Sequence, residues 1–392
     1  MDNIKKIALI GVGSRGWIGG IYYILNIINA LDKLEKGIEI HLFETKKQNF
    51  PDLSKFTNVQ IYRHNYEELF SPSNIYNKIY GRVAKFIFNY KNPRVERYLI
   101  KNKFDYVFPE RLSSHKGKLN IGSWIADFQF INHPDGSSQK NIALAKKTIY
   151  DIINKSNKII LSSKAIEKEC HSFFPETKEK TNVMPFAVYI NENHIKNNLT
   201  QIKKKYNLPD RFLVVSNLFA PTKNHKTLFK AISLLKKQGL RIPLFCTGNF
   251  VDSRNLEFPN EILSLITDYN IRNLINILGQ IPREEQIAIY RQAIAIVQPS
   301  FHEGWNTTVE EAKALGKFII LSDIAVHKEQ MPTNKNFFDP HNETELADKI
   351  LNVWDNTKDI VFPDTKKEAK SLLKYNKNVK DFGLNFLRIA SK

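Results

Sequence analysis

The chain has 392 residues, which is long for one hydrophobic core and natural for two domains. Hydrophobic residues make up 42% of it, and no apolar run approaches the roughly 18 to 20 residues that span a bilayer, so a disordered chain and a membrane-spanning one are both excluded. The net charge of +18 favours an anionic partner, but because no zinc-finger, RNP-like or KH motif accompanies it, we do not expect nucleic acid.

The two cysteines predict neither a disulfide framework nor a structural zinc site. Cys170 and Cys246 lie in different halves of the chain and in no metal-ligand spacing. The N-terminus shows no secretory signal pattern. We therefore expect a cytoplasmic protein. A second expectation is that it binds peripherally to the inner face of the plasma membrane.

The first predicted strand, residues 7–11, leads into a glycine-rich loop. Gly11, Gly13 and Gly16 have the spacing of a dinucleotide-binding fingerprint, which would indicate an NAD-dependent oxidoreductase. That fingerprint requires a helix that opens at the third glycine and an acidic residue about 20 residues later. Glu44, the acidic candidate, instead stands 28 residues after Gly16.

Two further glycines, Gly19 and Gly20, follow in the same loop, and we expect the helix to start only after them and to run to about Leu34. The oxidoreductase stays open as the weaker alternative.

Short apolar runs alternate with helical patterns along the rest of the first half, which predicts a parallel sheet covered by helices on both faces. The further runs are residues 38–44, 106–109, 119–125, 158–163 and 182–186. Residues 188–198 are polar and open a linker that we expect to end near Asn207.

The segment 77–103 interleaves basic and apolar residues. It is either a core-packed helix with a solvated basic face or a surface that contacts an anionic membrane.

The second half repeats the alternation, so we expect two doubly wound α/β domains. Its apolar runs are residues 212–217, 243–248, 275–281, 295–300 and 318–323, and a last helix is expected over residues 364–389. The predicted divisions are residues 1–200, residues 201–375, and a C-terminal helix, residues 376–392, that packs back on the first domain. Ligands of such sheets bind beyond the carboxyl ends of the strands.

The stretch 297–323 carries the strongest chemical signal. Glu303 lies in the loop after a predicted strand, and Glu311 lies in the first turns of a helix that is expected to begin near Thr307 or Thr308 and to end at Gly316. Unpaired amides at a helix start suit a phosphate, and a carboxylate can accept two hydrogen bonds from a vicinal diol. The pattern favours recognition of a sugar beside a phosphate, although an acidic pair of this kind also occurs as a helix-start charge and a surface charge.

The whole phrase "PSFHEGWNTTVEEAKALGKFIILSD" resembles the Glu-x7-Glu signature of glycosyltransferase family 4, the retaining nucleotide-sugar glycosyltransferases of GT-B fold. The resemblance implies two Rossmann-like domains that face each other across a cleft, with the acceptor on the first and the donor on the second. It also implies that Glu303 stabilises charge at the anomeric centre and that Glu311 holds the ribose. The implied donor contacts near the sugar or diphosphate are Gly304, Trp305, Asn306 and Thr307.

A second stretch, "VVSNLFAPTKNHKTLFKAI", resembles the family's loop after the first strand of the donor domain. The resemblance implies that Lys223 meets the leaving diphosphate, and Asn217 stands where family members have an arginine. A solvated loop lysine is the alternative for Lys223.

In the first domain, "WIADFQFINHP" resembles the family's W-I-P-D-F-Q-H stretch. Asp127 is implied in acceptor contact and in catalysis. Phe130 replaces the family histidine, which leaves His133 as the candidate, with an incidental surface histidine as the alternative. The glycine loop resembles the first loop of the GT-B fold, so Gly19 and Gly20 are implied near the donor.

The reaction expected from the resemblance is transfer of a sugar, a hexose in the first instance, from a nucleotide diphosphate sugar to a hydroxyl of a glycan or lipid-linked glycan, in surface polysaccharide or lipopolysaccharide biosynthesis. No two aspartates stand two positions apart, so we expect metal-independent transfer without a cofactor, with Lys223, helix amides and Arg15 meeting the diphosphate. A non-catalytic protein of the same fold that binds nucleotide sugars or glycans remains an alternative.

Overall fold

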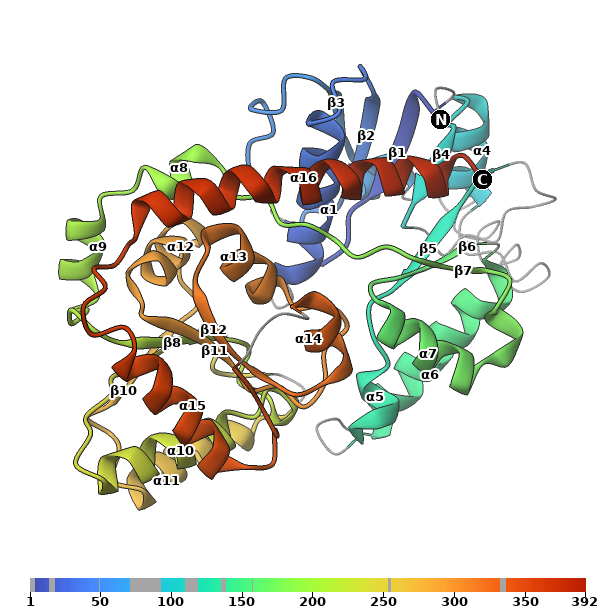
Figure 1. The fold of residues 1–392 in the computed structure, drawn as a ribbon. Helices are drawn as coiled ribbons and strands as arrows, with labels where there is room; N and C mark the ends of the chain where they lie inside the picture. Colours follow the sequence, from blue (N-terminus) through green and yellow to red (C-terminus); the bar gives the residue numbers. More distant parts are fainter. Residues whose placement is uncertain are drawn as a thin grey trace. The chain divides into compact units, whose positions relative to one another are not determined.

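A computed structural model of the protein describes residues 4–13, 18–48, 50–70, 93–109, 119–134, 139–156, 158–252, 255–331 and 336–392. The chain divides into two compact units (Figure 1). The first comprises Met1–Phe128, Leu144–Tyr189 and Lys377–Lys392, and the second comprises Gln129–Ala143 and Ile190–Asn376. Both are α/β with parallel sheets, which confirms the predicted class. The assignment of an acceptor side and a donor side stays a prediction.

The first unit contains two parallel sheets. One has the strand order β3-β2-β1-β4, formed by β1 (Lys6–Ile10), β2 (Glu39–Glu44), β3 (Gln60–Asn65) and β4 (Tyr106–Phe108). The other has the order β5-β6-β7, formed by β5 (Gly122–Ile125), β6 (Lys158–Leu161) and β7 (Thr181–Val183). An isolated parallel bridge between Val107 and Ile121 connects their edges.

The helix α1 (Ile18–Asp32) corrects the expectation that its first turn would follow Gly19 and Gly20, since both glycines lie inside it. A Cβ atom on Gly20 would lie 2.7 Å from the backbone nitrogen of Gly13. Glycine therefore lets the first turn of α1 pack directly on the backbone after β1.

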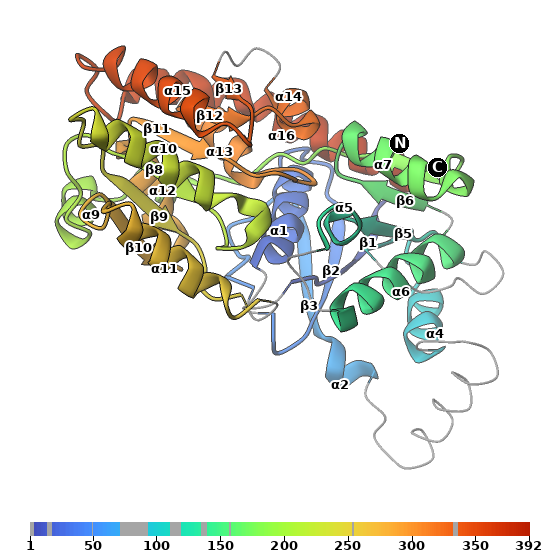
Figure 2. The ribbon, with the colours of Figure 1, turned by 90° about the horizontal axis from the view of Figure 1, so that it is seen from below.

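The remaining helices of the first half are α2 (Tyr66–Phe70), α4 (Pro93–Lys101), α5 (Gln129–Asn132), α6 (Gln139–Lys155) and α7 (Lys164–Phe173), with a 3₁₀ turn at Pro175–Thr177 (Figure 2). Most of the basic segment 77–103 lies outside the described residues. Its described end is α4, where Val95 and Leu99 pack in the core with Ala8 and Val107. For this end, the core-packed alternative holds.

The second unit contains one parallel sheet in the order β10-β9-β8-β11-β12-β13 (Figure 2). Its strands are β8 (Leu213–Ser216), β9 (Leu244–Thr247), β10 (Ile275–Gly279), β11 (Ala295–Gln298), β12 (Phe318–Ser322) and β13 (Phe337–Phe338). Each of the five predicted runs contains a strand, and β13 was not predicted.

Alternate residues of these strands enter two separate cores. Leu213 and Val215 pack on one face with residues of α10 (His225–Lys237), α11 (Phe258–Asp268) and α15 (Glu343–Asp355). Val214 packs on the other face with residues of α12 (Arg283–Gln292) and α13 (Thr307–Leu315). Burial on both faces explains why the strands are apolar throughout.

The predicted linker after residue 188 contains two short helices, α8 (Glu192–Ile195) and α9 (Leu199–Lys205), which were not predicted. Asn198 caps α9, and Ile202 anchors it in the core of the second unit. One buried residue on an otherwise polar helix gives too weak a periodic signal to be read from the sequence.

The predicted last helix is present as α16 (Thr365–Ala390), which follows α14 (Ala325–Gln330) and α15. Its residues up to Asn376 belong to the second unit, and those from Lys377 belong to the first. In the first unit, Phe386 meets the rings of Tyr106 and Phe108 with centroid distances of 5.6 and 5.5 Å.

Candidate functional site

Four neighbouring strands of the second unit end on buried polar residues, namely Ser216, Thr247, Gln298 and Ser322. The Thr247 hydroxyl donates to Ser216 Oγ at 2.7 Å, and Gln298 Nε2 donates to the Ser216 carbonyl at 3.4 Å. Because the carboxyl ends of parallel strands share one edge of a sheet, these contacts build a continuous polar floor there.

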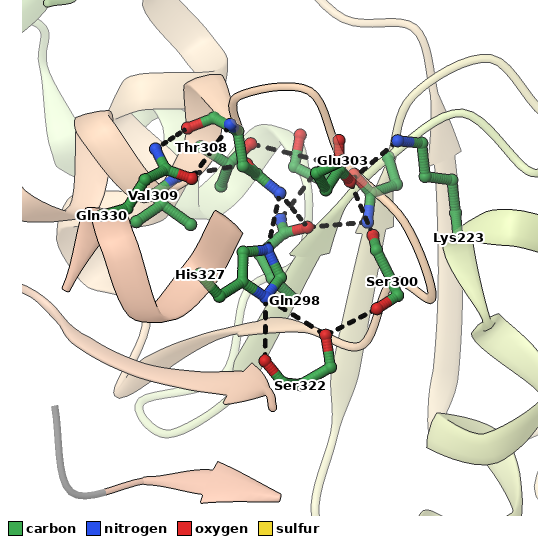
Figure 3. A network of polar contacts seen from close by, with 12 residues as sticks. Lys223, Gln298, Ser300, Glu303, Thr308, Val309, Ser322, His327 and Gln330 are labelled. Carbon is green, nitrogen blue, oxygen red and sulfur yellow. Dashed lines mark hydrogen bonds and ion pairs between the residues drawn. The ribbon is translucent and has the colours of Figure 1, made fainter. Parts of the chain in front are cut away.

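Glu303 lies above this floor in the loop between β11 and α13. Its Oε1 accepts hydrogen bonds from Lys223 Nζ and from the Ser300 hydroxyl, each at 2.7 Å (Figure 3). Burial alone would raise the pKa of the Glu303 carboxyl, but the Lys223 ammonium and the hydrogen bonds outweigh it and hold the pKa below its ordinary value. Glu303 is therefore ionised at neutral pH, and Lys223 is not the solvated loop lysine of the alternative.

The position of Lys223 is set by the residue that follows it. Lys223 closes a 3₁₀ turn, Pro221–Lys223, and Asn224 has a positive φ of 54°. The Asn224 side chain caps α10 through the Thr227 amide and donates to the carbonyls of Pro299 and Pro340 at 3.0 and 2.8 Å. Asn224 thus ties the lysine loop to the loop that carries Glu303.

The helix α13 begins at Thr307, as predicted, and ends at Gly316, which adopts the left-handed conformation with φ 63°. The Asn306 side chain caps it by accepting from the Val309 amide at 3.2 Å. The Asn306 amide itself donates to Gln330 Oε1 at 3.0 Å. The backbone amide of Asn306 is thus engaged inside the protein, and donor contact by this residue remains a prediction.

Glu311 is almost completely buried in α13, with 1% of its side chain exposed. Its Oε1 pairs with the guanidinium of Arg283, the first residue of α12. Burial raises the pKa of the Glu311 carboxyl, and Arg283 only partly opposes the rise. Arg283 was not among the residues predicted from the sequence.

His327 of α14 is hydrogen-bonded to the polar strand ends near Glu303 (Figure 3). Its Nδ1 lies 3.0 Å from the Ser322 carbonyl, which can only accept, so Nδ1 carries the hydrogen. Complete burial lowers the pKa of His327 to about 4, so the imidazole is neutral at pH 7. The Ser322 hydroxyl in turn donates to the Ser300 carbonyl at 2.6 Å.

The other predicted donor residues lie as follows. Asn217 Nδ2 donates to Gln298 Oε1 at 2.7 Å, so this amide supports the floor. Gly304 is buried and Trp305 is half-buried in the Glu303 loop. Gly19 and Gly20 lie in α1 of the first unit, and Arg15 lies outside the described residues. Donor contact for each remains a prediction.

The two predicted acceptor residues fall in different units. Asp127 is half-buried between β5 and α5 in the first unit. His133 belongs to the second unit, where its ring faces those of Phe301 and His302 with centroid distances of 6.3 and 5.8 Å. His133 therefore lies beside the loop that carries Glu303 and is not an isolated surface histidine.

The NAD alternative depends on Glu44 as a ribose ligand. Arg63 binds both carboxylate oxygens of Glu44, through Nε at 2.6 Å and Nη2 at 2.9 Å. A carboxylate held in a bidentate pair has fewer acceptor sites for a diol, which disfavours this alternative.

The described part of the chain bears on metals and membranes in two ways. Within it, no group of three or more His, Cys, Asp and Glu side chains is placed to hold a metal ion. Nor does that part contain a helix with the length and apolar character needed to cross a membrane. Whether the protein acts without a metal remains a prediction.

Comparison with protein families gives a match over the second unit. Residues 198–378, a little under half of the chain, match the family described as glycosyl transferases group 1. This range contains Lys223, Glu303 and Glu311.

Two curated relatives share part of the chain. The serotype-specific mannosyltransferase WbdA of Escherichia coli is 29% identical over 150 residues, which are 38% of this chain and 18% of that protein. The O-antigen chain mannosyltransferase B of Escherichia coli is 20% identical over 268 residues, which are 66% of this chain and 68% of that protein. The chain thus spans less than a fifth of the length of WbdA.

Solved structures resemble the chain over nearly its whole length. A glycosyltransferase from Rickettsia africae has a TM-score of 0.67 at 18% identity, covering 99% of this chain and 98% of that one. HepE from Anabaena, solved with UDP and glucose, has a TM-score of 0.66 at 16% identity, covering 99% and 100%. The chain therefore has the fold of the GT-B glycosyltransferases, and residues 198–378 match the group 1 family.

Proposed function

We propose that the protein is a retaining glycosyltransferase that moves a hexose from a nucleotide diphosphate sugar to a hydroxyl of a glycan or lipid-linked glycan. The observation that carries the proposal is the group of Lys223, Ser300 and Glu303, held by hydrogen bonds above the polar strand ends of the unit that matches the group 1 family. Mannose is the first sugar to test, because both curated relatives are named as mannosyltransferases, one of them of the O-antigen chain.

Each residue has a role that its surroundings support. Glu303, ionised beside Lys223, stabilises positive charge as it develops at the anomeric carbon. Lys223 places an ammonium where the diphosphate leaves. Glu311 accepts hydrogen bonds from the two ribose hydroxyls.

In the proposed reaction, the acceptor hydroxyl oxygen bonds to the anomeric carbon on the face that the diphosphate leaves. The bond between that carbon and the phosphate oxygen breaks, and the hydroxyl proton passes to the leaving phosphate. The protein contributes position and preorganised charge. Diphosphate charge is met by Lys223 and helix amides, and we propose that transfer proceeds without a metal or cofactor.

The acceptor is proposed to bind through Asp127 and His133. A lipid-linked acceptor would bring the protein to the cytoplasmic face of an anionic membrane, where its net charge of +18 favours association.

The test incubates the protein with mannose, glucose and galactose donors of GDP and UDP, together with lipid-linked glycan fractions, and measures released nucleoside diphosphate. We expect release that depends on one donor and on an acceptor, with the anomeric configuration of the donor kept in the product by NMR. Tight binding of a nucleotide sugar without acceptor-dependent release would instead indicate the non-catalytic alternative. Activity that EDTA removes and Mg²⁺ restores would contradict metal independence.

A further inference from the structure

Arg283 stands where the local rules of helix formation do not place an arginine. It is the first residue of α12, where the positive end of the helix dipole disfavours a cation, and the next two residues are glutamates. A residue that breaks a local preference without a local gain often serves a site elsewhere in the fold. The contacts of Arg283 show where that site is.

The guanidinium of Arg283 is held from two sides. Its Nη2 pairs with Glu311 Oε1, with 11% of the arginine side chain and 1% of the glutamate side chain exposed. Its Nη1 donates to Gln286 Oε1 at 3.0 Å, and Gln286 Nε2 donates to Ser216 Oγ at 2.6 Å. Arg283 is thereby anchored to the end of β8 and has one orientation toward Glu311.

A structural role alone explains this pair poorly. Replacing a buried ion pair with apolar residues is often neutral or stabilising, so such pairs contribute little net stability. The pair also leaves Glu311 Oε2 buried with no hydrogen bond of good geometry among the described residues, although the Tyr290 side chain lies close enough to favour the charged carboxylate. A carboxylate oxygen of this kind has unused capacity to accept from a ligand.

We propose that Arg283 is a positioning residue that holds Glu311 in the orientation in which it accepts hydrogen bonds from the two hydroxyls of the donor ribose. The inference rests on the proposed function and adds to it the residue that makes the nucleotide site selective for a ribose diol. A neutral carboxyl would present one hydroxyl donor in place of an acceptor and would bind the diol more weakly.

The charges around Glu311 set the direction of its titration. Arg283 and Tyr290 of α12 and Glu310 of its own helix face it. Burial and Glu310 raise the pKa of Glu311, and Arg283 is the cation that opposes them. Without Arg283, Glu311 becomes protonated over a wider range of pH and ionises only as the pH rises.

The experiment measures the binding of UDP, GDP and their 2′,3′-dideoxy counterparts by calorimetry to the wild type, Arg283→Gln, Arg283→Lys and the exposed control Arg241→Gln. We expect Arg283→Gln to weaken the preferred ribonucleotide about tenfold or more, the loss of one hydrogen bond to a charged group, and to leave the dideoxy nucleotide unchanged. Arg283→Lys should recover part of the loss. Between pH 6 and 9, ribonucleotide affinity should rise in Arg283→Gln more than in the wild type.

Equal weakening of the ribonucleotide and the dideoxy nucleotide would overturn the inference, because a merely structural residue acts on both. If the thermal unfolding profile of Arg283→Gln differs from that of the wild type, the binding of the ribonucleotide and of the dideoxy nucleotide is compared in Arg283→Lys instead. If the wild type binds neither UDP nor GDP, it is the proposed function that fails.

Discussion

The two units use the same α/β arrangement but finish their strands in different ways. In the second unit, β8, β9, β11 and β12 end on buried polar residues that are hydrogen-bonded to one another or to the Glu303 loop. In the first unit, β4 ends on Phe108, which is fully buried, and nearby Tyr23 stacks on Trp124 with a centroid distance of 4.0 Å. At the end of β4, aromatic packing occupies the place that polar networks occupy in the second unit, whereas β2 and β3 end on Glu44 and Asn65, which bond to Arg63 and Glu68.

This difference shows that the fold alone does not locate the chemistry. A buried polar network is costly unless every group is satisfied, so it persists where it holds reactive groups in place. In this chain it lies under Glu303 and beside Glu311. Substitutions at the polar strand ends of the second unit should therefore change the rate of sugar transfer. Substitutions of packed residues in the first unit should change the free energy of unfolding.

The largest expected effect is that of Glu303→Gln. Removing the carboxylate charge should lower kcat by about 10²- to 10³-fold, the range for loss of one preorganised electrostatic contact, while the fold persists. Glu311→Gln should instead act chiefly on donor binding. Glu261→Gln, an exposed glutamate of α11 paired with Lys226, is the matched control. Activity near wild type in both Glu303→Gln and Glu311→Gln would rule out the assignment of the site.

Lys223→Gln should have the next largest effect, with a fall in kcat of about 10- to 100-fold, since one charge at the leaving group is lost. The substitution also removes the cation that lowers the pKa of Glu303. The acidic limb of the pH–rate profile should therefore move to higher pH. The exposed Lys226→Gln provides the control, and a profile that does not move in Lys223→Gln would show that the two groups are uncoupled during transfer.

Gly20→Ala tests the packing role of the first unit. The new Cβ would lie 2.7 Å from the Gly13 nitrogen, and overpacking of this kind costs about 1–3 kcal/mol of unfolding free energy. Chemical denaturation measures the loss, with the exposed Gly19→Ala as control. A fall in donor affinity at unchanged stability would contradict the packing explanation and support the predicted donor contact.

Two buried histidines predict a pH dependence of stability that belongs to the second unit. Burial lowers the pKa of His225 to about 3 and of His327 to about 4, from 6.5. As the pH falls, these histidines are protonated in the unfolded state before they are protonated in the folded state. The free energy of unfolding is therefore highest above pH 6.5 and falls as the pH drops toward 4. At pH 5, His327 should account for a loss of about 2 kcal/mol relative to pH 7.5.

His327→Gln should flatten this slope, and the exposed His341→Gln should leave it as in the wild type. Urea denaturation at pH 7.5 and pH 5 measures both. An unchanged slope in His327→Gln would mean that the imidazole is accessible to protons in the folded state.

Local patterns identified the elements that are apolar on both sides. All five apolar runs of the second half contain strands, because a strand that is buried on both faces is a continuous run of apolar residues. The edge strand β3, Gln-Ile-Tyr-Arg-His-Asn, carries little of that signal and was missed. Helices α8 and α9 were also missed, because their buried residues contact residues that are far away in the sequence.

Short-range periodicity is enough to predict the fold class and the spacing that brings Glu303 and Glu311 to one strand end. The environments of these two carboxylates depend on long-range contacts. Lys223 forms an ion pair with Glu303 from 80 positions away, and Arg283 pairs with Glu311. The side chain of Asn217 and the backbone amide of Asn306 are engaged in supporting hydrogen bonds. These pairings join residues from different strand ends, and no local pattern encodes which loop ends meet. The physical reason is that the ionisation of a buried group depends on which charges the folded chain places around it.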